Sequence, residues 1–190
     1  MNFPLDVAKV IQAIGVLFRE DGVQSMNYMR LLKLLYIADR EAILETEQPI
    51  VGGPFIAMER GPVLEEVYDL IRGQHTDMPL WGDFLETKRY NIELIQKPDV
   101  KKLSRYEIKK LQDVSRRYIF QDEWDLAKIT HEFPEWIKNN PGSSSRKIPL
   151  DDILDALEIA ESKAAIVADT QESAGLRRDL ANAAAMVHHK

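Results

Sequence analysis

The sequence predicts a mainly α-helical protein with one or two short β-strands, built as a compact helical domain around a buried central helix. Three observations support this fold class. Apolar residues recur at three- and four-residue spacing in several segments of the 190-residue chain, as they do on the buried face of a helix. Residues 27–46 are apolar around almost the whole helical circumference, which is typical of a helix buried on all sides. Alternation of apolar and polar residues, the pattern of a half-buried strand, is confined to short stretches.

The first two helices of this prediction are the clearest. Apolar positions on one arc of residues 6–20 indicate an amphipathic helix that ends at Gly22. The central helix covers residues 27–46. Residues 47–61 contain prolines and a pair of adjacent glycines, so we expect a loop there, with at most a short strand at residues 55–58.

Helices alternate with irregular segments in the middle of the chain. Gly61 and Pro62 are expected to begin a helix that runs to Gly73, because a proline at the first helical position loses no hydrogen bond. Residues 74–86 look irregular. Residues 87–95 give the best strand pattern, since their apolar residues alternate with polar ones.

Further helices complete the prediction. Ser104 and Glu107 form a capping box, which predicts that a helix begins there. Residues 139–149 form the clearest loop. We expect residues 1–160 to form one domain and residues 161–190 a helical C-terminal extension. The remaining helices are expected within residues 122–132, 150–167 and 176–187.

Composition narrows the classes of function. Cysteine is absent, which excludes disulfides and thiolate chemistry, and the net charge of −6 argues weakly against unspecific binding to nucleic acid. No segment approaches the roughly 20 apolar residues that span a bilayer, and no secretion signal is recognisable. We therefore expect a cytoplasmic protein that does not contact the membrane.

Motifs of catalysis and of cofactor binding are missing from the sequence. The four histidines are scattered or terminal, so we expect no metal site, and no nucleophile or phosphate-binding motif is present. Asp39 and His131 could still form the acid and base of an unrecognised hydrolase. We favour a structural alternative, in which Asp39 accepts backbone hydrogen bonds from a Gly-Pro turn near Gly61 and His131 lies under an aromatic lid, because buried polar groups are normally partnered. We therefore expect no cofactor and no enzymatic activity.

A basic stretch stands out from the acidic whole. Residues 101–120 hold seven basic and two acidic residues. On the helix within residues 101–117 a basic stripe lies apart from the apolar face, as it would on a nucleic-acid-binding helix, on a solvated face or on a surface for an acidic protein partner. Aromatic residues do not interleave with it, so we rank nucleic acid below a protein partner. The basic stripe consists of Lys101, Arg105, Lys109 and Arg116.

Several short motifs follow one another along the chain in a distinctive order. The segment KLLYIAD covers residues 33–39, GPV covers residues 61–63, and a Thr-His pair with a later tryptophan follows within residues 126–140. These motifs resemble the Panacea domain family, the SocA-like antitoxins also described as phage-associated proteins. The resemblance spans about residues 5–160. Its family-like residues include Lys33, Tyr36, Asp39, Gly61, Pro62, Val63, His131 and Trp136.

The resemblance implies an antitoxin that binds and neutralises a cognate protein toxin, in one branch of the family by delivering the toxin to a protease. It implies no catalytic role, and we expect the family-like residues to be architectural. Self-association into a homo-oligomer stays open. Beyond the resemblance, Leu176, Leu180 and Val187 lie on one apolar stripe, which is expected to pack on its own domain, to dimerise or to contact the toxin.

Overall fold

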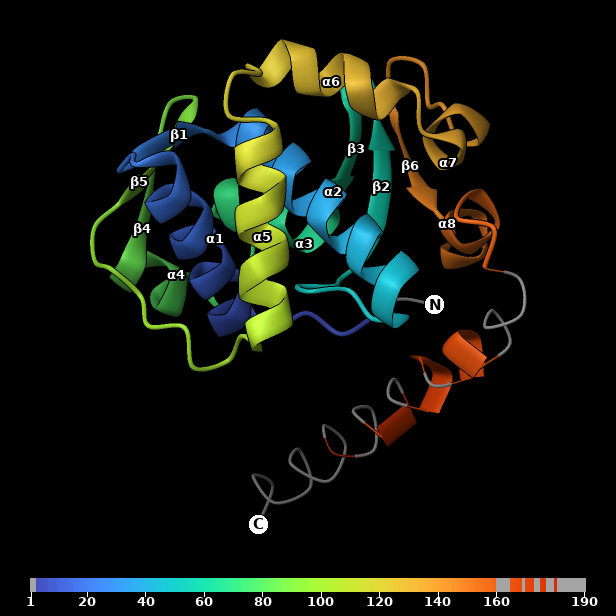
Figure 1. Cartoon of the computed structure of the whole chain (residues 1–190), viewed down its shortest axis with the longest axis horizontal. Helices are drawn as coiled ribbons and strands as arrows, with labels where there is room; N and C mark the ends of the chain where they lie inside the picture. The colour runs from blue at the N-terminus through green and yellow to red at the C-terminus, as the bar shows by residue number, and fades with distance from the viewer. Residues whose placement is uncertain (1–2, 160–164, 169, 173–174, 177–179, 181–190) are drawn as a thin grey trace.

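The computed structural model of this chain describes residues 3–159, 165–168, 170–172, 175–176 and 180. None of the described helices is both long and apolar enough to cross a membrane. Figure 1 shows the course of the chain from the first helix to the C-terminal segment.

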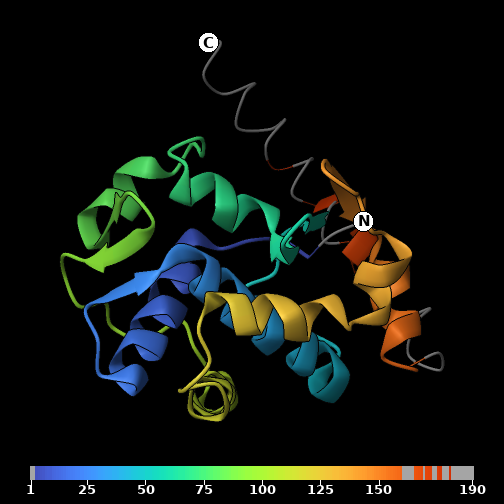
Figure 2. The same cartoon turned by 90° about the horizontal axis from the view of Figure 1, so that it is seen from above.

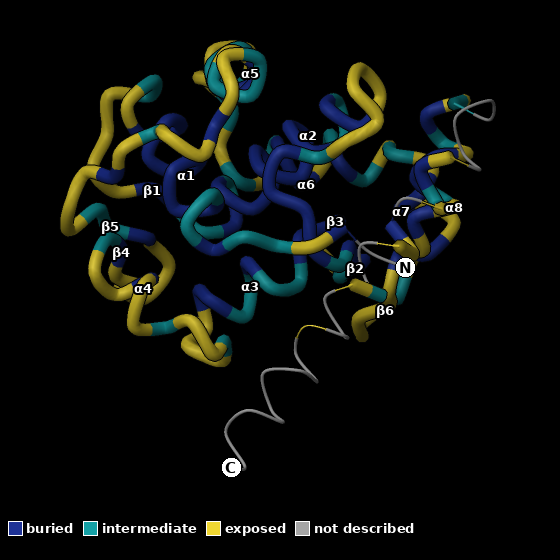
Figure 3. The backbone as a smooth tube through the Cα atoms, turned by 90° about the horizontal axis from the view of Figure 1, so that it is seen from below, coloured by how far each residue is buried: buried dark blue, intermediate teal, exposed yellow. Residues whose placement is uncertain are grey.

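Helix α2 (Tyr28–Thr46) lies at the centre of the molecule and is buried over most of its length (Figure 3), as its apolar circumference predicts. The side chain of Asn27 caps its first turn by accepting a hydrogen bond from the amide of Met29 at 2.8 Å. Helix α1 (Val7–Asp21) ends at Gly22, which has a left-handed backbone conformation. Both predicted helices are therefore confirmed.

Two further helices cover α2. Helix α5 (Arg105–Arg117) packs on α1 and α2 and begins with the predicted capping box of Ser104 and Glu107. Helix α6 (Glu123–His131) crosses α2, as the view from above shows (Figure 2). The helical layer thus wraps the buried α2.

The prediction of a mainly α fold with one or two strands is wrong. The structure contains two three-stranded antiparallel sheets, which lie on opposite sides of α2 (Figures 1 and 3), so the fold is mixed α and β. The first sheet has the order β1-β5-β4, with β1 at Ser25–Asn27, β4 at Leu85–Lys88 and β5 at Asn91–Leu94. The second has the order β3-β2-β6, with β2 at Phe55–Met58, β3 at Gly61–Leu64 and β6 at Ser145–Ile148.

Strand β3 explains one of the errors. The Gly61-Pro62 pair that predicted a helix start instead forms a hairpin with β2, in which Ala57 lies opposite Pro62. Because β3 is the edge strand of its sheet, the missing N–H of Pro62 removes no hydrogen bond from the ladder. Helix α3 (Glu65–Ile71) begins only after this strand.

Other elements were too short to predict. The expected single strand at residues 87–95 is split by a turn at Arg89, whose φ is 56°, into β4 and β5. Strand β6 lies within the expected loop and is recognisable only through its pairing with β2. Three short helices, α4, α7 and α8, cover Met78–Phe84, Pro134–Lys138 and Leu150–Ala156. The helix expected at residues 150–167 is therefore too long, since α8 ends at Ala156.

Candidate functional site

The β2–β3 hairpin is held by side chains from three helices. Lys33 of α2 donates a hydrogen bond from Nζ to the carbonyl of Pro62 at 2.8 Å, and Trp136 of α7 donates from Nε1 to the carbonyl of Met58 at 3.0 Å. His131 of α6 stacks on Trp136, with ring centroids 4.0 Å apart. The hairpin thus brings together residues that lie far apart in the sequence.

Gly61 begins the second strand of the hairpin and has a φ of +97°. A Cβ atom at this position would lie 2.6 Å from Thr130 Oγ1 and 2.9 Å from Lys33 Nζ. Both the backbone conformation and the space therefore require glycine. The close approach also shows that the Lys33 ammonium lies directly beside the hairpin.

His131 lies on the same side of the hairpin. Burial and the neighbouring Lys33 lower the pKa of its imidazole. Its Nε2 atom is buried and has no hydrogen-bond partner among the described residues. The ring stacks on Trp136, and a hydrogen bond with the backbone of Glu59 ties it to the hairpin.

Lys33 is the most unusual residue at this place. Its side chain is only 1% exposed, and within the described part of the chain it forms no ion pair. Burial lowers the pKa of its ammonium to about 7. Buried charges are ordinarily paired with an opposite charge. Among the described residues, the carbonyl oxygen of Pro62 is the one hydrogen-bond acceptor of Lys33.

A pocket of about 250 Å³ opens beside Lys33 and the hairpin. At its rim, the guanidinium of Arg60 lies over the ring of Trp124 at 4.8 Å, and Tyr28 stacks on Tyr90 with ring centroids 6.4 Å apart. The pocket is lined by Tyr28, Met29, Leu32, Lys33, Met58, Glu59, Arg60, Gly61, Val63 and Tyr68.

Asp39 binds a different turn from the one that the sequence indicated. Its carboxylate accepts hydrogen bonds from the amides of Ile50, Val51 and Gly52, each at 2.9 Å, and forms none with the Gly61 turn among the described residues. Burial raises the pKa of Asp39 to about 7, although the three amides act in the opposite direction. No hydrogen bond or ion pair joins Asp39 to His131 among the described residues, so the arrangement required by the hydrolase hypothesis is not formed.

Tyr36 takes part in a buried polar cluster that the sequence did not reveal. Its hydroxyl donates to Glu135 Oε1 at 3.0 Å, and Arg40 pairs with the same oxygen at 2.7 Å. The guanidinium of Arg40 lies 4.4 Å from the ring centroid of Phe133. Arg40 follows Tyr36 by one helical turn, which was the only available signal, because Glu135 comes from the distant helix α7. The cluster fixes α7 against α2.

The part of the chain that carries these contacts matches a known family. The family model for the antitoxin SocA-like Panacea domain matches residues 31–137. The chain belongs to this family. No curated protein and no solved structure matches it.

The Panacea domain match runs from α2 into α7. Elements outside the matched range complete the same fold. Strand β6 pairs with β2, and α1 packs against α5. The hairpin, Lys33, Asp39 and the Tyr36 cluster all lie within the Panacea match.

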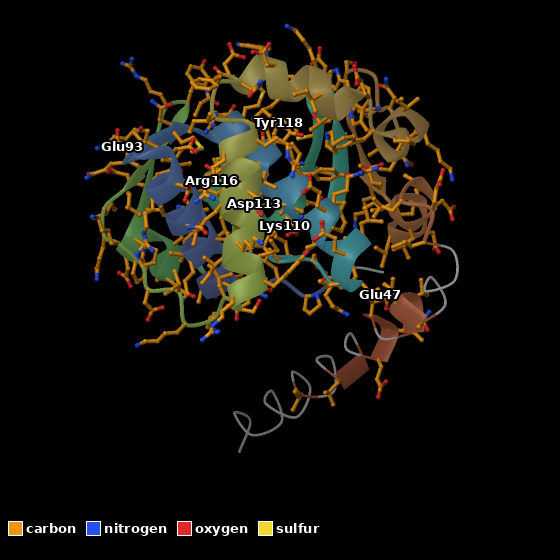
Figure 4. The ribbon with its side chains drawn as sticks, viewed as in Figure 1. Glu47, Glu93, Lys110, Asp113, Arg116 and Tyr118 are labelled. Atoms are coloured by element: carbon orange, nitrogen blue, oxygen red, sulfur yellow. The ribbon has the colours of Figure 1, made fainter. Side chains whose placement is uncertain are left out.

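Most of the basic residues near α5 are neutralised by acidic residues of the same chain. Arg116 points toward α1 and Lys110 toward α2 (Figure 4). Lys110 pairs with Glu41 and Glu45, and Arg117 also pairs with Glu41. Ion pairs further join Lys101 to Asp99, Lys102 to Asp6 and Arg116 to Glu20.

Arg105 and Lys109 remain exposed, and neither forms an ion pair within the described residues. Most basic residues of this stretch therefore form ion pairs within the chain, and several of these pairs join α5 to α1 and α2. This observation weakens the nucleic-acid hypothesis for the basic stripe.

The C-terminal stripe is described only in part. Leu176 is 63% exposed and Leu180 is 62% exposed, so neither side chain is covered by the Panacea domain. Val187 lies outside the described residues. The described residues contain no cluster of three or more His, Asp or Glu side chains that could hold a metal ion.

Proposed function

We propose that this protein is an antitoxin that neutralises a cognate protein toxin by direct binding in the cytoplasm, without catalysing a reaction. The observation that carries the proposal is the match of residues 31–137 to the antitoxin SocA-like Panacea domain. The contacts of Asp39 and Tyr36 support it, because they give these family-like residues structural roles.

Two surfaces are candidates for toxin contacts. One is the exposed part of the basic stripe at Arg105 and Lys109, which suits an acidic partner. Arg116 lies on the same helix, but its pair with Glu20 leaves it less available. The other is the apolar stripe that includes Leu176 and Leu180, which suits a groove on the toxin.

Co-expression with a toxic protein encoded beside this chain tests the proposal. We expect growth to be rescued and the toxin to co-purify with the full chain. The amount of toxin, followed by immunoblot, separates two routes: it stays constant if binding alone neutralises the toxin, and it falls if the complex is delivered to a protease. Rescue without association and without loss of toxin would contradict the proposal.

The same assay assigns the contact surface. A chain that lacks residues 170–190 is expected to remain folded, as circular dichroism checks, and to bind the toxin more weakly in titration calorimetry. Full affinity of the shortened chain removes the C-terminal stripe from the interface. Size-exclusion chromatography of the full chain shows whether it self-associates.

A further inference from the structure

Lys33 is a buried basic side chain without a matching anion among the described residues. Its ammonium carries three N–H donors, and the carbonyl of Pro62 accepts one of them at 2.8 Å. No carboxylate of the described chain pairs with it. By contrast, the cations of Lys110 and Arg40, which are also largely buried, each pair with a carboxylate. Lys33 therefore offers unused donors at a place where an anion would be stabilised strongly.

The pocket beside Lys33 has the size and charge for such an anion. Its volume of about 250 Å³ is far larger than the roughly 30 Å³ that a water molecule occupies in the liquid, so it can hold a side chain. Arg60 adds a second positive charge to the lining, and Glu59 is the one acidic residue that lines it within the described chain. The hydroxyl groups of Tyr28 and Tyr68 can donate further hydrogen bonds.

The surroundings of the pocket favour a protein as the source of this anion. Tyr90 is 70% exposed and Trp124 is 50% exposed, and both lie at the rim through their contacts with Tyr28 and Arg60. Tyrosine, tryptophan and arginine are the residue types that most often dominate the energy of protein interfaces. An anchored acidic side chain within an aromatic rim matches that arrangement.

We propose that the pocket between α2 and the β2–β3 hairpin receives an aspartate or glutamate side chain of the protein partner, whose carboxylate pairs with Lys33. The inference rests on the proposed function, since the partner is then the cognate toxin. Arg60 stabilises the same carboxylate, Glu59 opposes it, and the rim residues Tyr90 and Trp124 contact the residues that flank it. The antitoxin thus recognises one acidic anchor with a fixed part of its scaffold.

Binding to the pocket can be measured without any toxin. The probe is 3-phenylpropanoate, and its neutral counterpart 3-phenylpropanamide is the control. In ¹⁵N NMR titrations of the full chain we expect the carboxylate to shift the amide signals of Tyr28, Arg60 and Gly61 in a saturable way. If the carboxylate leaves these signals unmoved, or if the amide binds as tightly, the proposal is wrong.

Variants of the charged residues sharpen the titration. Lys33→Met and Arg60→Gln are each expected to weaken binding of 3-phenylpropanoate about tenfold, whereas Glu59→Gln is expected to strengthen it. Lys97→Met, which removes an exposed lysine that does not line this pocket, is the matched control and should bind as the wild type does. If Lys33→Met does not fold, Arg60→Gln and Glu59→Gln still decide the question, because both residues are exposed. Unchanged affinity in both of these variants overturns the proposal.

The toxin then tests the source of the carboxylate. We expect Lys33→Met and Arg60→Gln to lower the affinity for the toxin, and one Asp→Asn or Glu→Gln change on the toxin to have the same effect without adding to theirs. Another outcome is that the toxin binds all variants equally although the pocket binds 3-phenylpropanoate in the wild type. In that case the pocket takes a free carboxylate and not a side chain of the toxin, which contradicts the proposal. If the wild-type chain does not bind the toxin, the proposed function fails, and the small-molecule titration still judges the pocket.

Discussion

Helix α2 carries two buried charged side chains within two helical turns, and their surroundings differ. Asp39 accepts three backbone hydrogen bonds from the Ile50–Gly52 turn, so its carboxylate is fully engaged inside the fold. Among the described residues, Lys33 has one carbonyl partner, and it lies beside a pocket. Both are buried motif residues, yet Asp39 has three backbone donors from one turn, whereas Lys33 has a single acceptor among the described residues. The comparison separates a charge that builds the scaffold from a charge that is available to a ligand.

Asp39→Ala is expected to have the largest effect on stability. The change leaves the amides of Ile50, Val51 and Gly52 without an acceptor inside the protein, and each unsatisfied buried group costs about 1 kcal/mol or more. We therefore expect the free energy of unfolding, measured by urea titration, to fall by about 3 kcal/mol.

Asp113→Ala is the matched control for this change. Asp113 is a partly exposed carboxylate on α5, whose side chain lies 3.8 Å from Arg116. The control should change stability by less than about 0.5 kcal/mol. Equal melting behaviour of Asp39→Ala and the wild type, together with lost toxin binding, would move Asp39 from the scaffold to the interface.

Arg40→Met tests the buried carboxylate of Glu135, whose charge is compensated by the side chain of Arg40. The change leaves the fully buried carboxylate of Glu135 with the hydroxyl of Tyr36 as its remaining partner on α2 among the described residues. Because Arg40 is itself partly exposed, we expect a loss of about 2 kcal/mol, below the range for completely buried pairs. Tyr36→Phe removes one hydrogen bond and should cost about 1 kcal/mol. A smaller loss for Arg40→Met than for Tyr36→Phe contradicts this account.

The helical half of the fold was predictable because its signals are local. The apolar arc before Gly22, the apolar circumference of α2 and the Ser104 capping box each depend on residues within a few positions of one another. The sheets were not predictable, because strands of three or four residues show too little alternation. Strand β6 exists only through its pairing with β2, which lies about ninety residues earlier.

The same distinction applies to the site. The motif residues Lys33, Asp39 and His131 were found in the sequence through a family resemblance, but their partners were not. Asp39 binds a turn that carries no side-chain signal, since its three donors are backbone amides. The pocket beside Lys33 is formed by segments that meet only in the folded chain.

The stability of the protein should depend on pH through Lys33. Burial lowers its pKa from 10.5 to about 7 in the folded state. Between these values the unfolded chain binds a proton that the folded chain does not, so stability rises as the pH rises from about 7 toward 10. The full slope for one group is about 1.4 kcal/mol per pH unit, so we expect the free energy of unfolding to rise by about 2 kcal/mol between pH 7 and 9.

Lys33→Met is expected to lose this rise, and Lys109→Met to retain it. Urea titrations between pH 7 and 9 measure the difference, below the range in which the buried tyrosines ionise. Parallel curves for Lys33→Met and the wild type would show that the ammonium stays charged in the fold. Its burial would then need a compensating group.

The smallest effect is expected on the exposed side of α5. Arg105 and Lys109 are exposed and form no ion pair among the described residues, whereas Lys110 lies between Glu41 and Glu45. The double change Arg105→Gln and Lys109→Gln should therefore alter the free energy of unfolding by less than about 0.5 kcal/mol. Lys110→Gln, which breaks the pairs with both carboxylates, should cost about 1 kcal/mol. A contrary result is that the wild type shows salt-sensitive retention on DNA or RNA that the double variant loses. Arg105 and Lys109 would then bind nucleic acid, and their charges would serve a ligand and not the scaffold.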